Sequence, residues 1–137
     1  MKKLKTITVV LCTLCFSSTH FSTILAAPKE SFEVINTIAI EGDDKWDFLF
    51  SDDQANRRYV SHGSQVQVID EQSRKVIGKI TGLKGVHGIA IAPELHKGFI
   101  SNGKDSSVTI FNTTTFEVTD KIKVTGASPD AILFDSF

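Results

Sequence analysis

Residues 59–70 read YVSHGSQVQVID, and residues 99–112 read FISNGKDSSVTIFN. The two stretches share one sequence pattern, or phrase: a β-rich run, a polar residue followed by glycine, and a second β-rich run. Valine, isoleucine, phenylalanine and threonine favour strands, and the glycine with its polar neighbours favours a turn. The phrase therefore predicts two hairpins of the same design, the second with a small insertion near Lys104-Asp105.

A longer alignment shows a repeating unit of about 42 residues. Val34, Val76 and Val118 are 42 residues apart, and each is followed four positions later by an isoleucine. A further apolar run completes each unit: Phe48-Leu49-Phe50, Ile89-Ala90-Ile91 and Ile132-Leu133-Phe134. Four strands in a unit of this length are typical of a β-propeller blade. A β-sandwich is the alternative, but a sandwich does not require copies in register.

We therefore expect an all-β fold, a partial β-propeller in which residues 27–137 form an incomplete repeat domain. Two complete four-stranded blades are expected at about 46–82 and 87–124. Residues 32–40 would be a displaced N-terminal strand, and residues 130–136 the first strand of a third blade. Even the smallest propellers have four blades, so we expect a truncated propeller. The alternative is a short chain that assembles into a ring with other chains.

The N-terminal stretch predicts a secretory signal peptide over residues 1–26. A basic start is followed by an apolar run from Ile7 to Phe16 and by small residues before the expected cleavage after Ala26. A membrane anchor is the alternative, but the run is shorter than a bilayer-spanning helix. Cys12 and Cys15 would leave with the signal, so their C-x-x-C spacing is not read as a redox or metal motif. We expect a periplasmic or secreted protein with no membrane span after cleavage.

Charge and composition bear on the partners. The net charge of −1 would become about −4 once Lys2, Lys3 and Lys5 are removed, which argues against a nucleic-acid partner. The faces of blades at an open end are apolar, and unpaired strand edges are templates for pairing, so we expect a tendency to self-association. The other expected partner is a protein or small-molecule ligand that the sequence does not identify.

The repeated phrases resemble the YVTN-type β-propeller repeat family, which includes YncE-like periplasmic proteins. The family's Tyr-Val-Thr-Asn motif is matched by residues 59–62 and 99–102, its Val-x-Val-Ile-Asp strand by residues 66–70, and its Gly-Val-Ala-Val-Ser-Pro phrase by residues 88–93. The resemblance covers nearly all of residues 27–137. It implies a propeller of the kind that is often exported, and it implies no specific activity.

The candidate site residues come from the loops that enter the innermost strands, since these loops surround one mouth of a propeller channel. Trp46, His87 and Asp130 fall at equivalent points of the alignment, and Asn102 joins them as a binding candidate at the channel mouth. The alternative is that all four are turn and packing residues. No catalytic motif, metal-ligand spacing or cofactor motif is found, so no catalytic residue, metal or cofactor is assigned.

The sequence thus favours an exported binding or scaffold module of the periplasm or cell envelope over an enzyme. Two alternatives stay open. One is a propeller enzyme that uses Trp46, His87 and Asp130 at the channel mouth, and the other is a truncated product with no function of its own.

Overall fold

The computed structural model describes residues 31–42 and 45–136. The chain divides into two compact units, Met1–Val34 and Ile35–Phe137. Of the first unit only residues 31–34 are described, and they form no regular secondary structure. The signal peptide expected at 1–26 lies outside the described residues. Within them, no helix is long and apolar enough to cross a membrane.

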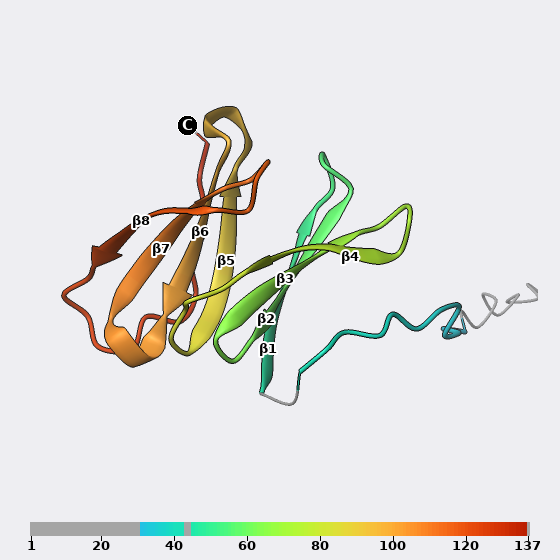
Figure 1. The fold of residues 1–137 in the computed structure, drawn as a ribbon, viewed down its shortest axis with the longest axis horizontal. Coiled ribbons are helices and arrows are strands. Elements are labelled where there is room, and N and C mark those ends of the chain that lie inside the picture. The colour runs from blue at the N-terminus through green and yellow to red at the C-terminus, as the bar shows by residue number, and fades with distance from the viewer. Residues whose placement is uncertain (1–30, 43–44, 137) are drawn as a thin grey trace, which may run out of the picture. The chain divides into compact units, whose positions relative to one another are not determined.

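The second unit contains two four-stranded antiparallel sheets, each a simple meander (Figure 1). Sheet 1 consists of β1 (Trp46–Asp52), β2 (Arg57–His62), β3 (Gln65–Asp70) and β4 (Lys75–Ile80). Sheet 2 consists of β5 (Val86–Ala92), β6 (Lys97–Asn102), β7 (Ser107–Asn112) and β8 (Val118–Lys123). Two 3₁₀ turns, η1 (Pro93–Leu95) and η2 (Gly103–Asp105), are the helical elements of the described residues. The all-β fold and the two blade-like units are confirmed.

The repeat extends to the irregularities of the two sheets. Leu49 pairs with Val60 in sheet 1 as Ile89 pairs with Ile100 in sheet 2, and the first strand of each sheet has a register shift just before this pair. A second shift occurs at the same place in the β3–β4 and β7–β8 pairs. The predicted insertion is η2, which lengthens the β6–β7 turn relative to the β2–β3 turn at Gly63.

The core lies between the two sheets, where β5 packs against β1 and β2. Sheet 1 contributes Tyr59, Val66, Val68 and Ile80, and sheet 2 contributes Ile89, Ile91, Ile100 and Phe111. The Tyr59 and Phe111 rings meet with centroids 5.9 Å apart. Fully burying one such side chain contributes roughly 1.5–3 kcal/mol, so the stability of each sheet depends on the other.

Polar contacts fix how one sheet sits on the other. The Arg57 guanidinium donates to the Thr113 carbonyl oxygen at 2.5 Å and lies 5.1 Å from the centre of the Phe116 ring. At the other end of the sheets, the Ser61 hydroxyl donates to the carbonyl oxygen of His87. Ser101, its counterpart one repeat later, donates in the same way to the carbonyl oxygen of Asp130.

Two expected strands are not formed. Residues 31–42 and 130–136 have no strand structure, although Glu41 and Asp130 are each hydrogen-bonded to a sheet. Glu41 accepts a hydrogen bond from Gln67 through its carbonyl oxygen, and the Asp130 carbonyl oxygen accepts one from Gly88 N at 3.1 Å. A strand requires a ladder of backbone hydrogen bonds to a neighbouring strand, and such isolated contacts do not make one.

Candidate functional site

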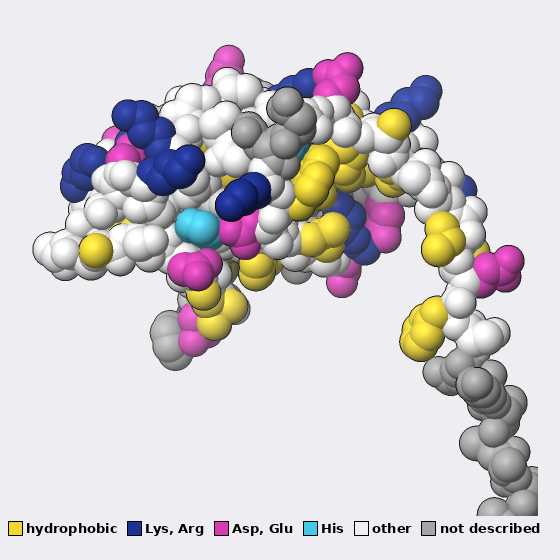
Figure 2. All heavy atoms as spheres, turned by 90° about the horizontal axis from the view of Figure 1, so that it is seen from below, with side chains coloured by type: hydrophobic (Ala, Val, Ile, Leu, Met, Phe, Trp, Pro, Cys, Tyr) yellow, Lys and Arg dark blue, Asp and Glu magenta, His cyan; other side chains and the backbone are white. Residues whose placement is uncertain are grey.

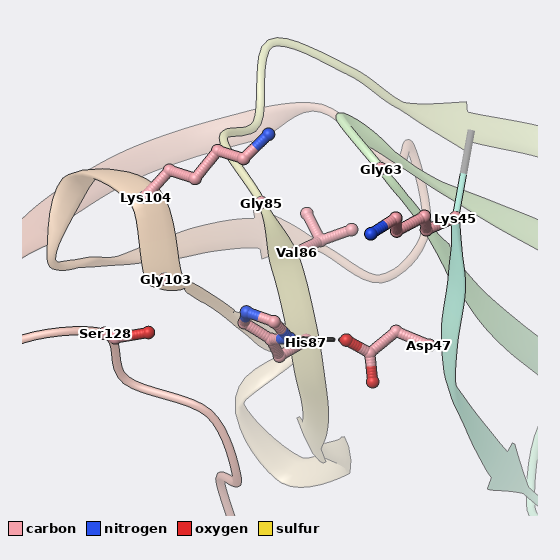
Figure 3. Close-up of a pocket in the computed structure, with 9 residues that line it drawn as sticks. All are labelled: Lys45, Asp47, Gly63, Gly85, Val86, His87, Gly103, Lys104 and Ser128. Carbon is pink, nitrogen blue, oxygen red and sulfur yellow. Dashed lines mark hydrogen bonds and ion pairs between the residues drawn. The ribbon is translucent and has the colours of Figure 1, made fainter.

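A pocket of about 410 Å³ lies where the first strands of the two sheets begin (Figure 3). This volume is within the range of small-molecule sites, roughly 300–1,000 Å³. The pocket is lined by Lys45, Asp47, Gly63, Gly85, Val86, His87, Gly103, Lys104 and Ser128. Both sheets and the turns that follow β2 and β6 therefore contribute to it, as does the loop after β8.

Asp47 and His87 connect the two sheets at the pocket. His87 Nδ1 is hydrogen-bonded to Asp47 Oδ2, and Asp130 Oδ1 lies 3.9 Å from the same nitrogen. An ionised carboxylate only accepts hydrogen bonds, so Nδ1 carries the proton. Nε2 is then an acceptor in the neutral ring and a second donor in the imidazolium form. The pair holds the imidazole in one orientation at the boundary between the sheets.

Gly103 leaves open the space between His87 and Ser128. A Cβ atom at Gly103 would lie 2.6 Å from His87 Nε2 and 3.1 Å from Ser128 Oγ, so a side chain there would collide with the imidazole and crowd the hydroxyl. Ser128 itself has a left-handed backbone, with φ of 51°. For a residue other than glycine this conformation is uncommon and needs support from its surroundings. The imidazole and the hydroxyl thus share one part of the pocket.

Two lysines complete the polar lining. Figure 3 shows the Lys45 and Lys104 side chains extending toward Gly85 and Val86 from opposite sides. Among the described residues, neither ammonium group is within ion-pair distance of a carboxylate; the ion pairs found there involve Arg58, Lys79, His87 and Lys121. The surface view of Figure 2 shows a histidine bordered by acidic and basic side chains.

Trp46 does not line the pocket. Its indole stacks on the His62 ring, with centroids 3.8 Å apart and planes 4° apart, and half of the residue is exposed. Trp46 pairs with His62 as Val86 pairs with Asn102. The equivalence expected between Trp46 and His87 is therefore wrong by one residue: Asp47 is the counterpart of His87. The offset is the same along both first strands, since Leu49 pairs with Val60 as Ile89 pairs with Ile100.

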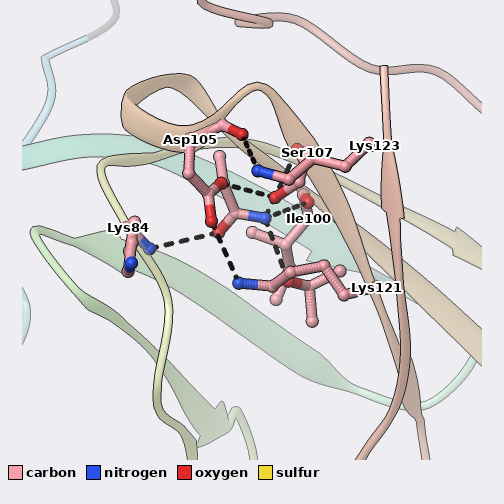
Figure 4. A network of polar contacts seen from close by, with 8 residues as sticks. Lys84, Ile100, Asp105, Ser107, Lys121 and Lys123 are labelled. Carbon is pink, nitrogen blue, oxygen red and sulfur yellow. Dashed lines mark hydrogen bonds and ion pairs between the residues drawn. The ribbon is translucent and has the colours of Figure 1, made fainter.

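Asn102 is fully buried and does not line the pocket. Figure 4 labels Lys84, Ile100 and Ser107, whose backbone atoms are among the hydrogen-bond partners of Asn102. Its amide Nδ2 donates to Thr109 Oγ1 at 2.9 Å and to the carbonyl oxygens of Ile100 and Ser107, and its Oδ1 accepts from Lys84 N at 3.3 Å. These bonds occupy the amide within the protein. The structure thus brings His87 and Asp130 together and places Asn102 and Trp46 elsewhere.

The same region contains a second polar cluster, outside the pocket. Asp105 accepts hydrogen bonds from the Ser107 hydroxyl at 2.5 Å and from Lys121 Nζ at 3.4 Å. The Ser107 hydrogen bond is the largest cause of the lowered pKa of Asp105, and Lys121 and Lys123 lower it further. Lys121 and Lys123 therefore stabilise the β6–β7 turn, whereas Lys45 and Lys104 line the pocket.

In the described part of the chain, no group of three or more histidine, cysteine, aspartate or glutamate side chains is placed to hold a metal ion. Asp47 and Asp130 approach the same nitrogen of His87 rather than surrounding a common centre. Sequence reasoning missed Lys45, Asp47, Lys104 and Ser128. For Asp47 a signal was available, because Asp47 adjoins Trp46 in the stretch of sequence that corresponds to those of His87 and Asp130.

No family model matches the sequence, and no curated protein does. Two solved structures of AztD from Citrobacter koseri are similar, one of them the apo protein: the TM-score is 0.57, identity is 17–18%, and the match covers 66% of this chain and 26% of AztD. Hydrazine synthase of Kuenenia stuttgartiensis matches with a TM-score of 0.61 and 19% identity, over 74% of this chain and 29% of that chain.

Both are β-propeller proteins. The chain spans about a quarter of their length, and identities this low show the fold alone. The two sheets, their register and these similarities together show that the chain has the fold of part of a β-propeller.

Proposed function

We propose that the chain is an exported β-propeller module of the YVTN type that binds a ligand in the periplasm or cell envelope. The pocket at the start of β1 and β5 carries the proposal. It is a concave site of suitable volume whose polar groups come from both sheets and three repeats. Pockets with a few converging polar groups at the boundary of structural units are the usual places for ligands.

The elements around the pocket suit binding without chemistry. Its walls are two tight turns and the starts of β1 and β5, each of which is paired within its own sheet. Such elements hold side chains more firmly than long loops do. His87 is fixed by Asp47 on one side, and Val86 supplies a buried apolar floor. A ligand seated here would touch both sheets, so its binding would also stabilise their packing.

A second candidate function is hydrolysis, and one observation favours it. Asp47, His87 and Ser128 supply a carboxylate, an imidazole and a hydroxyl in one pocket, and Asp47 faces Nδ1, leaving Nε2 on the side of Gly103 and Ser128. This is the order of groups that activates a serine nucleophile. Among the described residues no hydrogen bond joins Ser128 to His87, so binding is the function that the geometry supports better.

The first experiment measures the molar mass of the purified chain by light scattering together with its far-UV circular dichroism spectrum. A β-rich, monodisperse sample then allows NMR titration of the histidine ring protons with a ligand panel. A ligand that shifts His87 and leaves the exposed His96 unchanged supports the site. If no member of a broad panel moves His87, the binding proposal is wrong.

Two further measurements test the remaining parts of the proposal. A fluorophosphonate probe should label the protein only if Ser128 is activated, and labelling that is lost in Ser128→Ala and kept in Ser106→Ala would replace binding by hydrolysis. For export, residues 1–26 fused to a phosphatase that is active only outside the cytoplasm should give enzyme activity in a bacterium. An inactive fusion, detected as full-length protein, would contradict export.

A further inference from the structure

The charges around the pocket indicate what kind of ligand it takes. Three groups of charged or titratable side chains face it: the lysines Lys45 and Lys104, the pair Asp47 and His87, and Asp130 beside that pair. Asp47 is already hydrogen-bonded to His87, which reduces its capacity to attract a cation. The two ammonium groups have no carboxylate within ion-pair distance in the described residues.

The neighbouring basic residues make the contrast clear. Lys121 and Lys79, which are also exposed at sheet edges, each lie within ion-pair distance of an acid, at 3.4 Å from Asp105 and 2.9 Å from Glu41. Lys45 and Lys104 instead extend over the pocket from opposite sides (Figure 3). Between them lie Gly85 and Val86, which add no competing charge.

We propose that the pocket binds a small molecule through a carboxylate or phosphate group held between Lys45 and Lys104. The proposal rests on the proposed function, because it assumes that this pocket is the binding site. Lysine ammonium groups bind such oxyanions as point charges with three donors each. Ser128 Oγ and the ring of His87 lie at the side of the pocket, where they can bond to the rest of the ligand.

The chain contains a built-in reporter for this site. Trp46 is the single tryptophan, and it lies between Lys45 and Asp47 in the sequence, half exposed and stacked on His62. A ligand that pulls Lys45 inward changes the surroundings of the indole. Intrinsic fluorescence therefore follows binding without a label, and the His87 ring protons supply a second, independent signal.

The test titrates the full chain with inorganic phosphate and, separately, with succinate, while tetramethylammonium and xylose serve as cationic and neutral probes of similar size. Both signals are recorded in low salt and again at about 0.5 M NaCl, where exposed charges are screened beyond a few Å. The phosphate and succinate arms tell a phosphorylated ligand from a carboxylic acid. Variants Lys45→Met and Lys104→Met are compared with Lys75→Met, an exposed lysine on β4 outside the pocket.

We expect phosphate or succinate to move both signals, and each pocket variant to weaken binding by about two- to fivefold, whereas Lys75→Met and wild type agree. The double variant Lys45→Met/Lys104→Met should lose about tenfold or more. Two outcomes would overturn the oxyanion proposal while leaving the binding site intact: tighter binding of tetramethylammonium or xylose, or phosphate binding that the lysine variants do not weaken. If no probe and no member of the wider panel moves His87, the site itself is refuted. Circular dichroism spectra confirm that the variants are folded.

Discussion

Gly98→Ala should separate the two sheets at the centre of their contact. A Cβ atom at Gly98 would lie 2.1 Å from Cζ and 2.2 Å from Cε1 of Phe111, where ordinary contacts begin at 3.4 Å. The Phe111 ring has no exposed surface and packs against Tyr59 of the other sheet, so it cannot retreat without moving Tyr59 or β6. Overpacking of this kind costs about 1–3 kcal/mol.

For a unit of about 100 residues, each kcal/mol lowers the melting temperature by roughly 4–8 °C, so we expect a decrease of about 4–24 °C. Thermal and urea unfolding followed by circular dichroism measures it. Gly126→Ala is the matched control, because nothing lies within 4 Å of a Cβ atom built at Gly126. The double change Gly98→Ala/Phe111→Leu replaces the ring by a smaller side chain. It should destabilise the protein by less than the sum of the two single changes. If Gly98→Ala unfolds at the wild-type midpoint, the described packing of Phe111 is wrong.

Three other changes test the polar interior. Asn102→Ala should lower stability by about 1–3 kcal/mol, measured by urea unfolding, because Thr109 Oγ1 and Lys84 N lose a buried partner. Tyr59→Phe should leave stability unchanged within about 0.5 kcal/mol or raise it, since the buried hydroxyl makes no hydrogen bond of good geometry among the described residues. Burial raises the pKa of Tyr59, and the nearby Arg57 guanidinium only partly offsets this. A loss of stability above about 1 kcal/mol would show that the contact with Arg57 stabilises the fold. Asp105→Asn tests the lowered pKa of Asp105. The ionised carboxylate stabilises the fold above its ordinary pKa of 3.8, and the contribution disappears as the pH falls through the lower folded value. The stability difference between wild type and variant should therefore be constant above about pH 5 and shrink toward pH 2.

The fold could be predicted from the sequence because the same pattern of strands and turns recurs in each repeat. A spacing of 42 residues, recurring valine and isoleucine positions and two copies of one hairpin phrase were sufficient for both sheets and for the insertion at η2. The strands expected at 32–40 and 130–136 show the limit of this reasoning. An apolar, β-rich stretch has the propensity for a strand, but it becomes one only when another strand lies beside it.

The site was only partly predictable, for geometric reasons. The position of His87 and Asp130 could be read from the repeat, but only the strand pairing, in which Trp46 corresponds to Val86, shows that Asp47 is the counterpart of His87. Asp47 is also the residue that is hydrogen-bonded to His87. One residue of offset turns a strand side chain to the opposite face. Asn102 aligns with His62 and precedes a glycine, and no sequence pattern shows that its amide points inward to Thr109.

The hydrogen bonds that the Ser61 and Ser101 hydroxyls donate bear on how a repeat protein can gain repeats by gene duplication. Each serine stands on the second strand of one repeat and reaches the carbonyl oxygen of the residue that opens the next repeat. Because a backbone carbonyl is present whatever the residue, the acceptor is independent of whether histidine or aspartate occupies the position. A duplicated gene segment of one repeat would therefore encode both halves of a matched junction from the start. Residues that face the pocket can then differ between repeats, as His87 differs from Asp47 and Asp130, without any change to the bond that joins neighbouring repeats.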